Sequence, residues 1–366
     1  MRIERVDVIP FSIPLRKSVG FATGALEAAN HVLVRVTDSD GRVGEAEAMA
    51  RPMIYGETVA SIVAAYGEFL SAACIGKYPW ELSKIEQATS NLVRNETARG
   101  SLDLACWDLW AKQLEVPCHR LLGGHADSVS VSVLLGHGNE TEVVEEAQSY
   151  AEKYGITAFR AKVGINLKAD IAACGALRRA LGPDVLLSAD ANHGFNSAEA
   201  RSFAHACREL DLLWFEEPCP VEDLFGRARL VQSDLIPTLA DESVTSPGES
   251  AREILSGRAT AVSIKVARTG ILSSNRIRGF CESLNVPVVM GTQGETGLGT
   301  LAVAAYSASS SSTCRYPMES GILLQLTDDL LANPLVPVEG KFTLTNQPGW
   351  GGVIDPDKLQ HYRRDA

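Results

Sequence analysis

The stretch "VLLSADANHGFNSAEARSFAHACRELDLLWFEEP", residues 185–218, decides the fold. It begins with a short apolar run that ends in acidic and amide residues and continues through a helix-like segment. It closes with a second apolar run that again ends in acids. Near-continuous apolar runs are typical of parallel strands that are covered on both faces. The stretch therefore predicts a strand–helix–strand unit whose polar residues stand at the strand ends.

The same rhythm recurs from Ser128 to the last of eight strand candidates. The candidates are "VSVSVLLG", "TAFRAKVG", "VLLSADAN", "LLWFEEP", "PTLADES", "AVSIKVAR", "PVVMGTQ" and "TCRYPMES". Eight units of this kind predict a (β/α)8-type barrel. In such a barrel the carboxyl ends of all strands meet at one mouth, where active sites lie.

The first 125 residues have a different pattern and predict an α+β domain. Residues 2–15 and 31–48 favour strands, the second with a hairpin turn at Asp40–Gly41. Helical patterns follow at residues 58–73, 80–93 and 95–113. We therefore expect a capping domain at 1–125, completed by a C-terminal segment at about 325–366, and a catalytic barrel at 126–324.

Composition narrows the functional class. The chain has 366 residues and a formal net charge of −11, which disfavours nucleic-acid binding. It contains no apolar run long enough for a membrane span and begins without a signal-peptide core. The eight cysteines are scattered without a C-x-x-C pair, which is typical of a reducing compartment. We expect a cytoplasmic protein that does not bind membranes and lacks structural disulfides or zinc.

Three carboxylates end three successive strand candidates. Asp190, Glu216 and Asp241 are separated by 26 and 25 positions. Carboxylates brought together repel one another, and a divalent cation relieves that repulsion. Oxygen ligands without nearby His or Cys favour Mg²⁺, or Mn²⁺. The alternative is that each carboxylate forms a separate salt bridge or is solvated on its own loop.

Cations stand at the ends of other strands. Arg160 and Lys162 lie two apart on one predicted strand, so their side chains share a face. Lys265 ends the sixth strand, which is opposite the second in an eight-strand ring. A partly desolvated lysine beside a metal has a lowered pKa and acts as a base near neutral pH. The alternative is an ion pair, for instance between Lys162 and Asp190.

The chain resembles the enolase superfamily and, within it, the muconate-lactonizing-enzyme subgroup. The resemblance runs essentially end to end. It rests on "LDLACWDLWAK", "LLGG", "FRAKVG", "DAN", "WFEEP", "ADES", "SIKVARTG", "GTQGETGLGT" and "PGWGGVIDPDKLQHY". It implies a (β/α)7β-type modified TIM barrel with an N-terminal capping domain, and metal-dependent enolate chemistry.

The resemblance also implies roles for individual residues. Metal ligands would be Asp190, Glu216 and Asp241; catalytic residues would be Lys162, Lys265 and Glu295; supporting residues would be Arg160, Asn192 and Glu242. Arg160 is a departure, because the family's K-x-K motif has lysine there. An arginine keeps its charge, so we expect Arg160 to tune Lys162 or bind a carboxylate. The capping loops near residues 17–24 and 51–58 would close over the substrate.

Substrate contacts are less sharply defined. Tyr55, Gln293 and Glu319 are candidates for substrate binding. A turn around Gly56 explains Tyr55 and its neighbour Arg51 equally well, and a loop hydrogen bond is the alternative for Gln293. His193 is expected to be a solvated loop histidine.

The implied activity is that of a muconate cycloisomerase in aromatic catabolism, acting on a small-molecule carboxylate. The range 265–300 has no histidine, which argues against a mandelate-racemase type, and "YPMESG" lacks the D-x-D of dipeptide epimerases. Open alternatives are a racemase or epimerase of an amino-acid derivative, a hydroxy-acid dehydratase, and a non-catalytic relative. Relatives suggest a homo-oligomer, either a dimer or an octamer.

Overall fold

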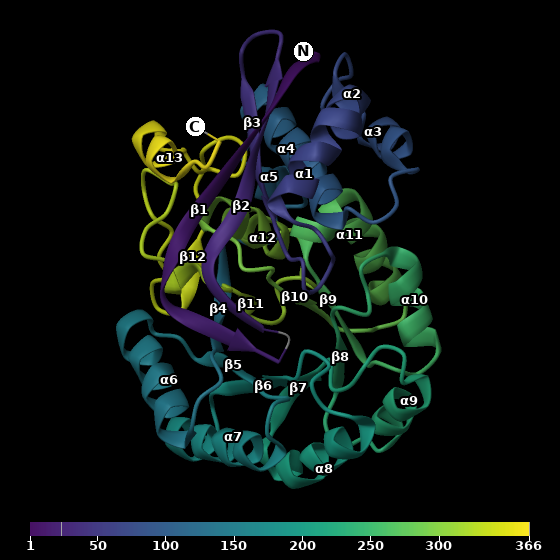
Figure 1. Ribbon diagram of the computed structural model, residues 1–366, viewed down its shortest axis with the longest axis vertical. Helices are drawn as coiled ribbons and strands as arrows, with labels where there is room; N and C mark the ends of the chain where they lie inside the picture. Colours follow the sequence, from purple (N-terminus) through teal and green to yellow (C-terminus); the bar gives the residue numbers. More distant parts are fainter. Residues whose placement is uncertain (23, 366) are drawn as a thin grey trace.

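The computed structural model describes residues 1–22 and 24–365, and its centre is a nearly closed parallel barrel (Figure 1). The barrel strands are β4 (Ser128–Leu135), β5 (Ala158–Lys162), β6 (Leu186–Asp190), β7 (Leu212–Glu216), β8 (Thr238–Ala240), β9 (Ala261–Ile264), β10 (Val288–Met290) and β11 (Met318–Glu319). Neighbours in this order pair from β4 to β10, and β11 pairs in parallel with β4. The predicted barrel class is confirmed.

Seven helices connect these strands and form the outer layer (Figure 1). They are α6 (Glu140–Tyr154), α7 (Leu167–Leu181), α8 (Ser197–Cys207), α9 (Leu224–Gln232), α10 (Pro247–Leu255), α11 (Val266–Ser283) and α12 (Gly297–Ser307). Local sequence defines their ends. Asn139 and Asn196 cap α6 and α8 in capping boxes with Glu142 and Glu199. Gly155 ends α6 in the left-handed conformation that glycine favours.

The N-terminal part forms an antiparallel sheet covered by helices. Its strands are β1 (Ile3–Phe21), β2 (Gly24–Asp38) and β3 (Val43–Met49); its helical segments are α1 (Val59–Ala65), a π-helical turn (Tyr66–Leu70), α2 (Ser71–Cys74), α3 (Leu82–Thr89), α4 (Glu96–Gln113) and α5 (Cys118–Leu121). β2 and β3 flank the expected turn, with Gly41 at φ 81°.

The β1–β2 hairpin is longer than the sequence predicts. β1 continues past Leu15 to Phe21, so the hairpin extends over the mouth of the barrel (Figure 1). Ala22 there lies against Gly194, in the loop after β6. A polar run at residues 16–18 conceals this strand extension, because its side chains are exposed. The hairpin thus brings the N-terminal sheet to the strand ends.

The C-terminal segment touches both parts of the molecule. β12 (Lys341–Thr343) pairs antiparallel with β4, whereas α13 (Pro356–Tyr362) packs near β1. Bridges also join Leu15 to Leu326 and Phe11 to Arg363. These contacts agree with a tail that packs back on the first domain, while the domain limits at 125 and 325 stay predictions. Among the described residues, every helix falls short of the length or apolar character that crossing a bilayer requires.

The capping part and the barrel join tightly where α4 crosses α11. Gly100 of α4 lies against the backbone of α11, and a Cβ added there would stand 2.6 Å from the Ala267 carbonyl oxygen. Asp103, one turn further along α4, accepts a hydrogen bond of 2.6 Å from the Ile271 backbone. Close packing of this kind tolerates little added volume.

We expect the substitution Gly100→Val to lower the free energy of unfolding by about 1–3 kcal/mol, because the two helix backbones have to separate. Urea unfolding followed by circular dichroism measures this. The control is Gly67→Val, because a Cβ at Gly67 meets no atom within 4 Å. Equal effects of the two substitutions would contradict the packing argument.

Candidate active site

A cavity of about 410 Å³ lies between the barrel mouth and the capping part. Barrel residues from several strand ends form its floor, including Lys162, Asp190 and Lys265. Phe21 of the hairpin and residues 50–55 of the loop after β3 form its roof. The two capping loops expected to cover the substrate thus line the cavity, although residue 23 lies outside the described chain.

The three predicted metal ligands stand side by side at the carboxyl ends of β6, β7 and β8. Asp190 and Glu216 are register partners, and Asp241 directly follows β8. All three side chains are buried. Arg160 lies between the first two, with Nη1 at 3.3 Å from Asp190 Oδ2 and 2.8 Å from Glu216 Oε2. The barrel therefore gathers these carboxylates as the sequence spacing predicts.

The two lysines approach the carboxylates from opposite sides of the ring. Lys162 on β5 donates to Asp190 Oδ2 at 2.6 Å and to Asn192 Oδ1 at 2.5 Å. Lys265, which follows β9, donates to Asp241 Oδ2. β5 and β9 are four strands apart in the ring of eight. Phe21 covers Lys162, whose Nζ lies 4.9 Å from the ring centroid.

Carboxylates and cations are crowded together on and beneath this floor. Asp190, Glu216, Asp241, Glu242 and Glu319 lie here with the permanent cations Arg160, Lys162, Lys265 and Arg268, and His193 lies beside Glu242. Burial raises the pKa of Glu216 well above its ordinary value; Arg160 opposes the shift, and the charge of Asp190 adds to it. Burial likewise raises the pKa of Glu242, and Asp241 adds to that shift. A cluster of buried carboxylate oxygens is a donor set that fits a divalent cation such as Mg²⁺.

The protein's own groups act on Lys265 in the direction opposite to the sequence-based expectation. Burial alone lowers its pKa, but the Asp241 carboxylate outweighs burial, and the net pKa is raised. The pKa of Asp241 is lowered in turn, because Lys265 and Arg268 outweigh its burial. The expected lowering of a lysine pKa depends on a bound cation and is not a property of the chain alone.

Arg160 is tied to three carboxylates. Besides Asp190 and Glu216, it contacts Glu319 of β11 at 2.8 Å. It shares the inward face of β5 with Lys162, as their spacing predicts. Glu319 also accepts a hydrogen bond from the Thr292 backbone and is 8% exposed. The structure thus places Glu319, a candidate for substrate binding, in an ion pair beneath the cavity.

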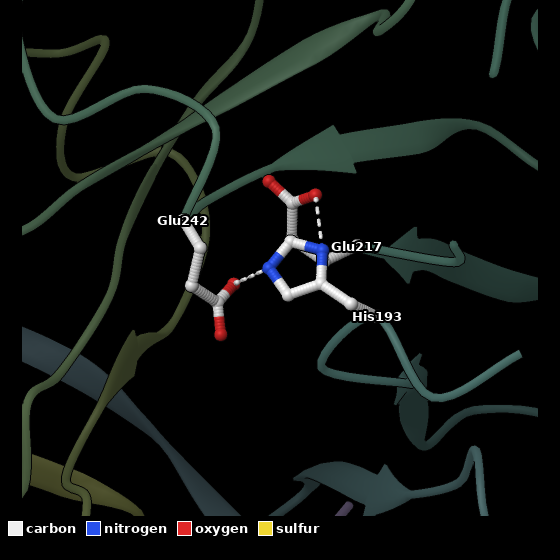
Figure 2. A group of neighbouring side chains, drawn as sticks. All are labelled: His193, Glu217 and Glu242. Atoms are coloured by element: carbon white, nitrogen blue, oxygen red, sulfur yellow. Dashed lines mark ion pairs between the residues drawn. The ribbon is translucent and has the colours of Figure 1, made fainter. Parts of the chain in front are cut away.

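His193 is not a solvated loop residue. It lies between Glu217 and Glu242, at 3.6 Å from Glu217 Oε2 and 3.9 Å from Glu242 Oε2 (Figure 2). Among the described residues, these three form a group whose ligand atoms all lie within 4.8 Å of one another, a spacing that suits a metal. Burial lowers the pKa of His193, but the two carboxylates outweigh it and the net pKa is raised.

Glu217 argues against a metal at that group. Its Oε2 pairs with Arg227 at 2.7 Å, and its Oε1 accepts from the Asp241 backbone and from both the backbone and hydroxyl of Ser243. Both oxygens are therefore already engaged. The three side chains are explained without a metal, because a protonated His193 bridges Glu217 and Glu242. The predicted ligand set at Asp190, Glu216 and Asp241 remains a prediction.

The two supporting residues connect Lys162 to this bridge. Asn192 accepts from Lys162 and donates through Nδ2 to Glu242 Oε1 at 2.8 Å. Asn192 and His193 have φ of 40° and 63°, and Glu217 has 35°. Non-glycine residues rarely adopt positive φ, and such strain clusters at functional sites. The backbone after β6 and β7 is thus bent to direct these side chains inward.

The remaining candidates occupy different positions. Glu295 is buried, with its carboxylate accepting from the Thr292 hydroxyl and the Gln293 backbone. Gln293 lines the cavity, and its side-chain amide has no hydrogen-bond partner among the described residues, so the alternative of a loop hydrogen bond is not observed. Tyr55 lines the cavity and accepts from Arg268 at 2.8 Å.

Sequence reasoning missed two buried arginines. Arg268 is 2% exposed and donates to Asp241 Oδ1 at 2.9 Å as well as to Tyr55. Arg227 holds Glu217. The signal for Arg268 was its place three residues after Lys265 in "SIKVAR", at the start of α11. Arg227 lies within α9 without a comparable signal.

Comparison with known proteins gives the family. Residues 4–123 match the N-terminal domain of mandelate racemase and muconate lactonizing enzyme, and residues 142–358 match the enolase C-terminal domain-like family. A muconate lactonizing enzyme from Mycobacterium smegmatis, solved with muconolactone, is 40% identical, has a TM-score of 0.98 and is covered completely by this chain, as this chain is by it.

Other relatives have different activities. The L-Ala-D/L-Glu epimerase of Bacillus subtilis is 28% identical over 96% of each chain. A dipeptide epimerase from Enterococcus faecalis, solved with Mg and a dipeptide, is 25% identical with a TM-score of 0.90, over 96% of this chain and 99% of that one. Enzymes of this superfamily use a divalent metal, and the acidic floor described above fits one. The chain therefore belongs to the enolase superfamily, among the enzymes related to mandelate racemase and muconate lactonizing enzyme.

Proposed function

We propose that this enzyme is a muconate cycloisomerase that converts cis,cis-muconate to muconolactone. The observation that carries the proposal is the pair of lysines, Lys162 and Lys265, which reach one cavity from opposite sides above three carboxylates. Such a pair suits proton transfer at a carbon next to a carboxylate. The end-to-end likeness to a muconate lactonizing enzyme at 40% identity supports this substrate over those of the more distant epimerases.

Asp190, Glu216 and Asp241 would hold the divalent cation, Mg²⁺ or Mn²⁺. When bound, it would stabilise negative charge that develops on a substrate carboxylate. Arg160 would position two of these ligands, because it contacts both Asp190 and Glu216. Its planar guanidinium keeps its charge and forms several directed hydrogen bonds at once.

The reaction needs one proton. An oxygen of one substrate carboxylate bonds to C4, and the π electrons of the neighbouring double bond shift towards the other carboxylate. A proton then adds at the carbon beside that carboxylate. One C–O and one C–H bond form, one π bond is consumed, and the dianion becomes a monoanion. We assign proton delivery to Lys265, with anti addition, because among the described residues Lys265 is held by Asp241 alone, whereas Lys162 is held by both Asp190 and Asn192.

Epimerisation of an amino-acid derivative is the second candidate, because two lysines on opposite faces suit proton removal and return. A substrate ammonium group, however, needs an available carboxylate. Glu319, the acid at the end of β11, is engaged by Arg160 and the Thr292 backbone. This contact favours a substrate without an amine.

The first test is turnover. Purified enzyme with Mn²⁺ should remove the ultraviolet absorbance of cis,cis-muconate, and in deuterated water each lactone should carry one deuterium, placed anti to the new C–O bond. Nuclear magnetic resonance of the product measures both. No loss of absorbance, with exchange of the α-proton of N-acyl amino acids or dipeptides instead, would favour the epimerase.

Lysine substitutions separate the two proposed roles. Lys265→Met should lower kcat by roughly 10²–10⁴-fold, because the proton donor is lost. Lys162→Met should also slow turnover, but the remaining product should keep the deuterium anti. Mn²⁺ affinity of both variants serves as the control for an intact site. Syn product from an active Lys265→Met variant would reverse the assignment.

Metal binding distinguishes the predicted ligand set, which includes Glu216, from the group around His193. Glu216→Gln should weaken Mn²⁺ binding by at least about 100-fold, because a ligand is removed, whereas His193→Gln should weaken it less than about tenfold. Electron paramagnetic resonance of free Mn²⁺ gives both affinities without an activity assay. If His193→Gln has the larger effect, the metal belongs to the group of Figure 2.

A further inference from the structure

The cavity has a second charged corner, opposite Asp190. In the strand order from β4 to β11, β10 is four positions from β6, so the loop after β10 faces Asp190 across the mouth. Gln293 and Gly294 form this loop, and Arg51 of the capping part reaches it. All three line the cavity. A molecule held at the carboxyl end of β6 would present its far end to this corner.

Arg51 lacks a carboxylate partner. Its Nη2 donates to the backbone carbonyl of Gln293, its Nη1 donates to that of Ala50 at 3.1 Å, and no carboxylate oxygen of the described residues lies within 4.0 Å. A guanidinium carries five N–H donors, so several remain. Burial lowers its pKa, and the nearby charges of Glu295 and Tyr55 offset this in part. A desolvated cation without a counter-ion gains from an anionic ligand.

Gln293 provides a second, independent observation. Its side chain is 5% exposed, yet neither its Nε2 nor its Oε1 has a hydrogen-bond partner. A buried polar group left unpaired costs about 1–3 kcal/mol, which a ligand can recover. Its backbone is fixed, because the amide donates to Glu295 and the carbonyl accepts from Arg51. Gln293 is therefore placed to donate to the same ligand that Arg51 attracts.

We propose that Arg51 and Gln293 form a second carboxylate subsite, which makes the enzyme specific for substrates with a carboxylate at each end. The inference rests on the proposed function in one respect, which is that one carboxylate of the substrate binds at the ends of β6, β7 and β8. Arg51 neutralises the far carboxylate and fixes its direction, and Gln293 donates one hydrogen bond to it. A carboxylate with two oxygens leaves one oxygen available to attack C4.

This subsite acts mainly on the ground state. The attacking carboxylate loses its negative charge as the lactone forms, so its attraction to Arg51 weakens along the reaction. An interaction that is no stronger in the transition state lowers KM without raising kcat. Removing Arg51 should therefore raise KM for the dicarboxylate by at least about tenfold, with a smaller change in kcat.

Calorimetry with unreactive ligands tests the subsite without turnover. Adipate has the same carbon number as muconate, and monomethyl adipate lacks one charge. With Mg²⁺ present, wild-type enzyme should bind adipate at least about tenfold more tightly than the monoester. Arg51→Met should remove this preference, and Arg51→Lys should keep part of it. We compare the ratio of the two affinities, adipate over monoester, between the wild type and Arg51→Met. The change in this ratio isolates the Arg51 contact, because a general loss of structure affects both ligands alike.

The matched control is Arg16→Met. Arg16 is an exposed arginine on β1, also in the capping part, and it does not line this cavity. Arg16→Met removes one positive charge, as Arg51→Met does, and it should preserve the tenfold preference for adipate over the monoester. An equal loss of preference in Arg16→Met and Arg51→Met, or equal wild-type affinity for both ligands, would overturn the subsite.

The outcomes separate the two proposals. If adipate is preferred through Arg51 but muconate is not converted, the subsite stands and the cycloisomerase assignment fails. If muconate is converted but Arg51→Met leaves both the ligand preference and the KM unchanged, the cycloisomerase stands and the subsite fails. Gln293→Met, which keeps the volume, should weaken adipate binding by about three- to tenfold, and unchanged binding would remove Gln293 from the subsite.

Discussion

The site depends on one electrostatic constraint: buried carboxylates at adjacent strand ends have to be balanced by cations in fixed positions. Parallel pairing brings Asp190 and Glu216 together as register partners. Arg160 spans them, while Lys265 and Arg268 hold Asp241. Burial nevertheless raises the pKa of Glu216, and the neighbouring charge of Asp190 adds to that shift although Arg160 opposes it. The same crowding of carboxylate oxygens suits a divalent cation, and the two lysine ammonium groups lie beside it in the ring.

The sequence predicts the barrel and the ends of its strands because apolar runs, turn residues and strand-terminal acids are local signals. The ion pair between Lys162 and Asp190, given as an alternative from the sequence, is present, but the other pairings of cations with acids are not predicted. Arg160 meets Glu319 from β11, and Arg268 meets Tyr55 from the capping loop, because the ring closes and the cap covers it. The bridge at His193 was missed for the same reason, since Glu217 and Glu242 come from two later strand ends.

Arginine at position 160 has a structural consequence. Its Nη1 lies within 3.3 Å of carboxylate oxygens from β6, β7 and β11. A lysine would be a point charge on a flexible stem, whereas the guanidinium is planar and always charged. Arg160 therefore holds Glu319 away from the cavity and leaves Lys162 to contact Asp190 and Asn192. In this chain Glu319 therefore belongs to the network that supports the site.

The cap contributes to the two sides of the cavity in different ways. Tyr55 is joined through Arg268 to Asp241, so this part of the loop is coupled to the acidic floor. Arg51, four residues earlier, is joined to the loop after β10 and lacks an acidic partner. One short loop thus contacts the ring after β10 and, through Arg268, after β8. The unpaired charge of Arg51 then selects ligands by the group that reaches it. Substrate choice can therefore change through the cap while the carboxylates and lysines of the barrel stay the same.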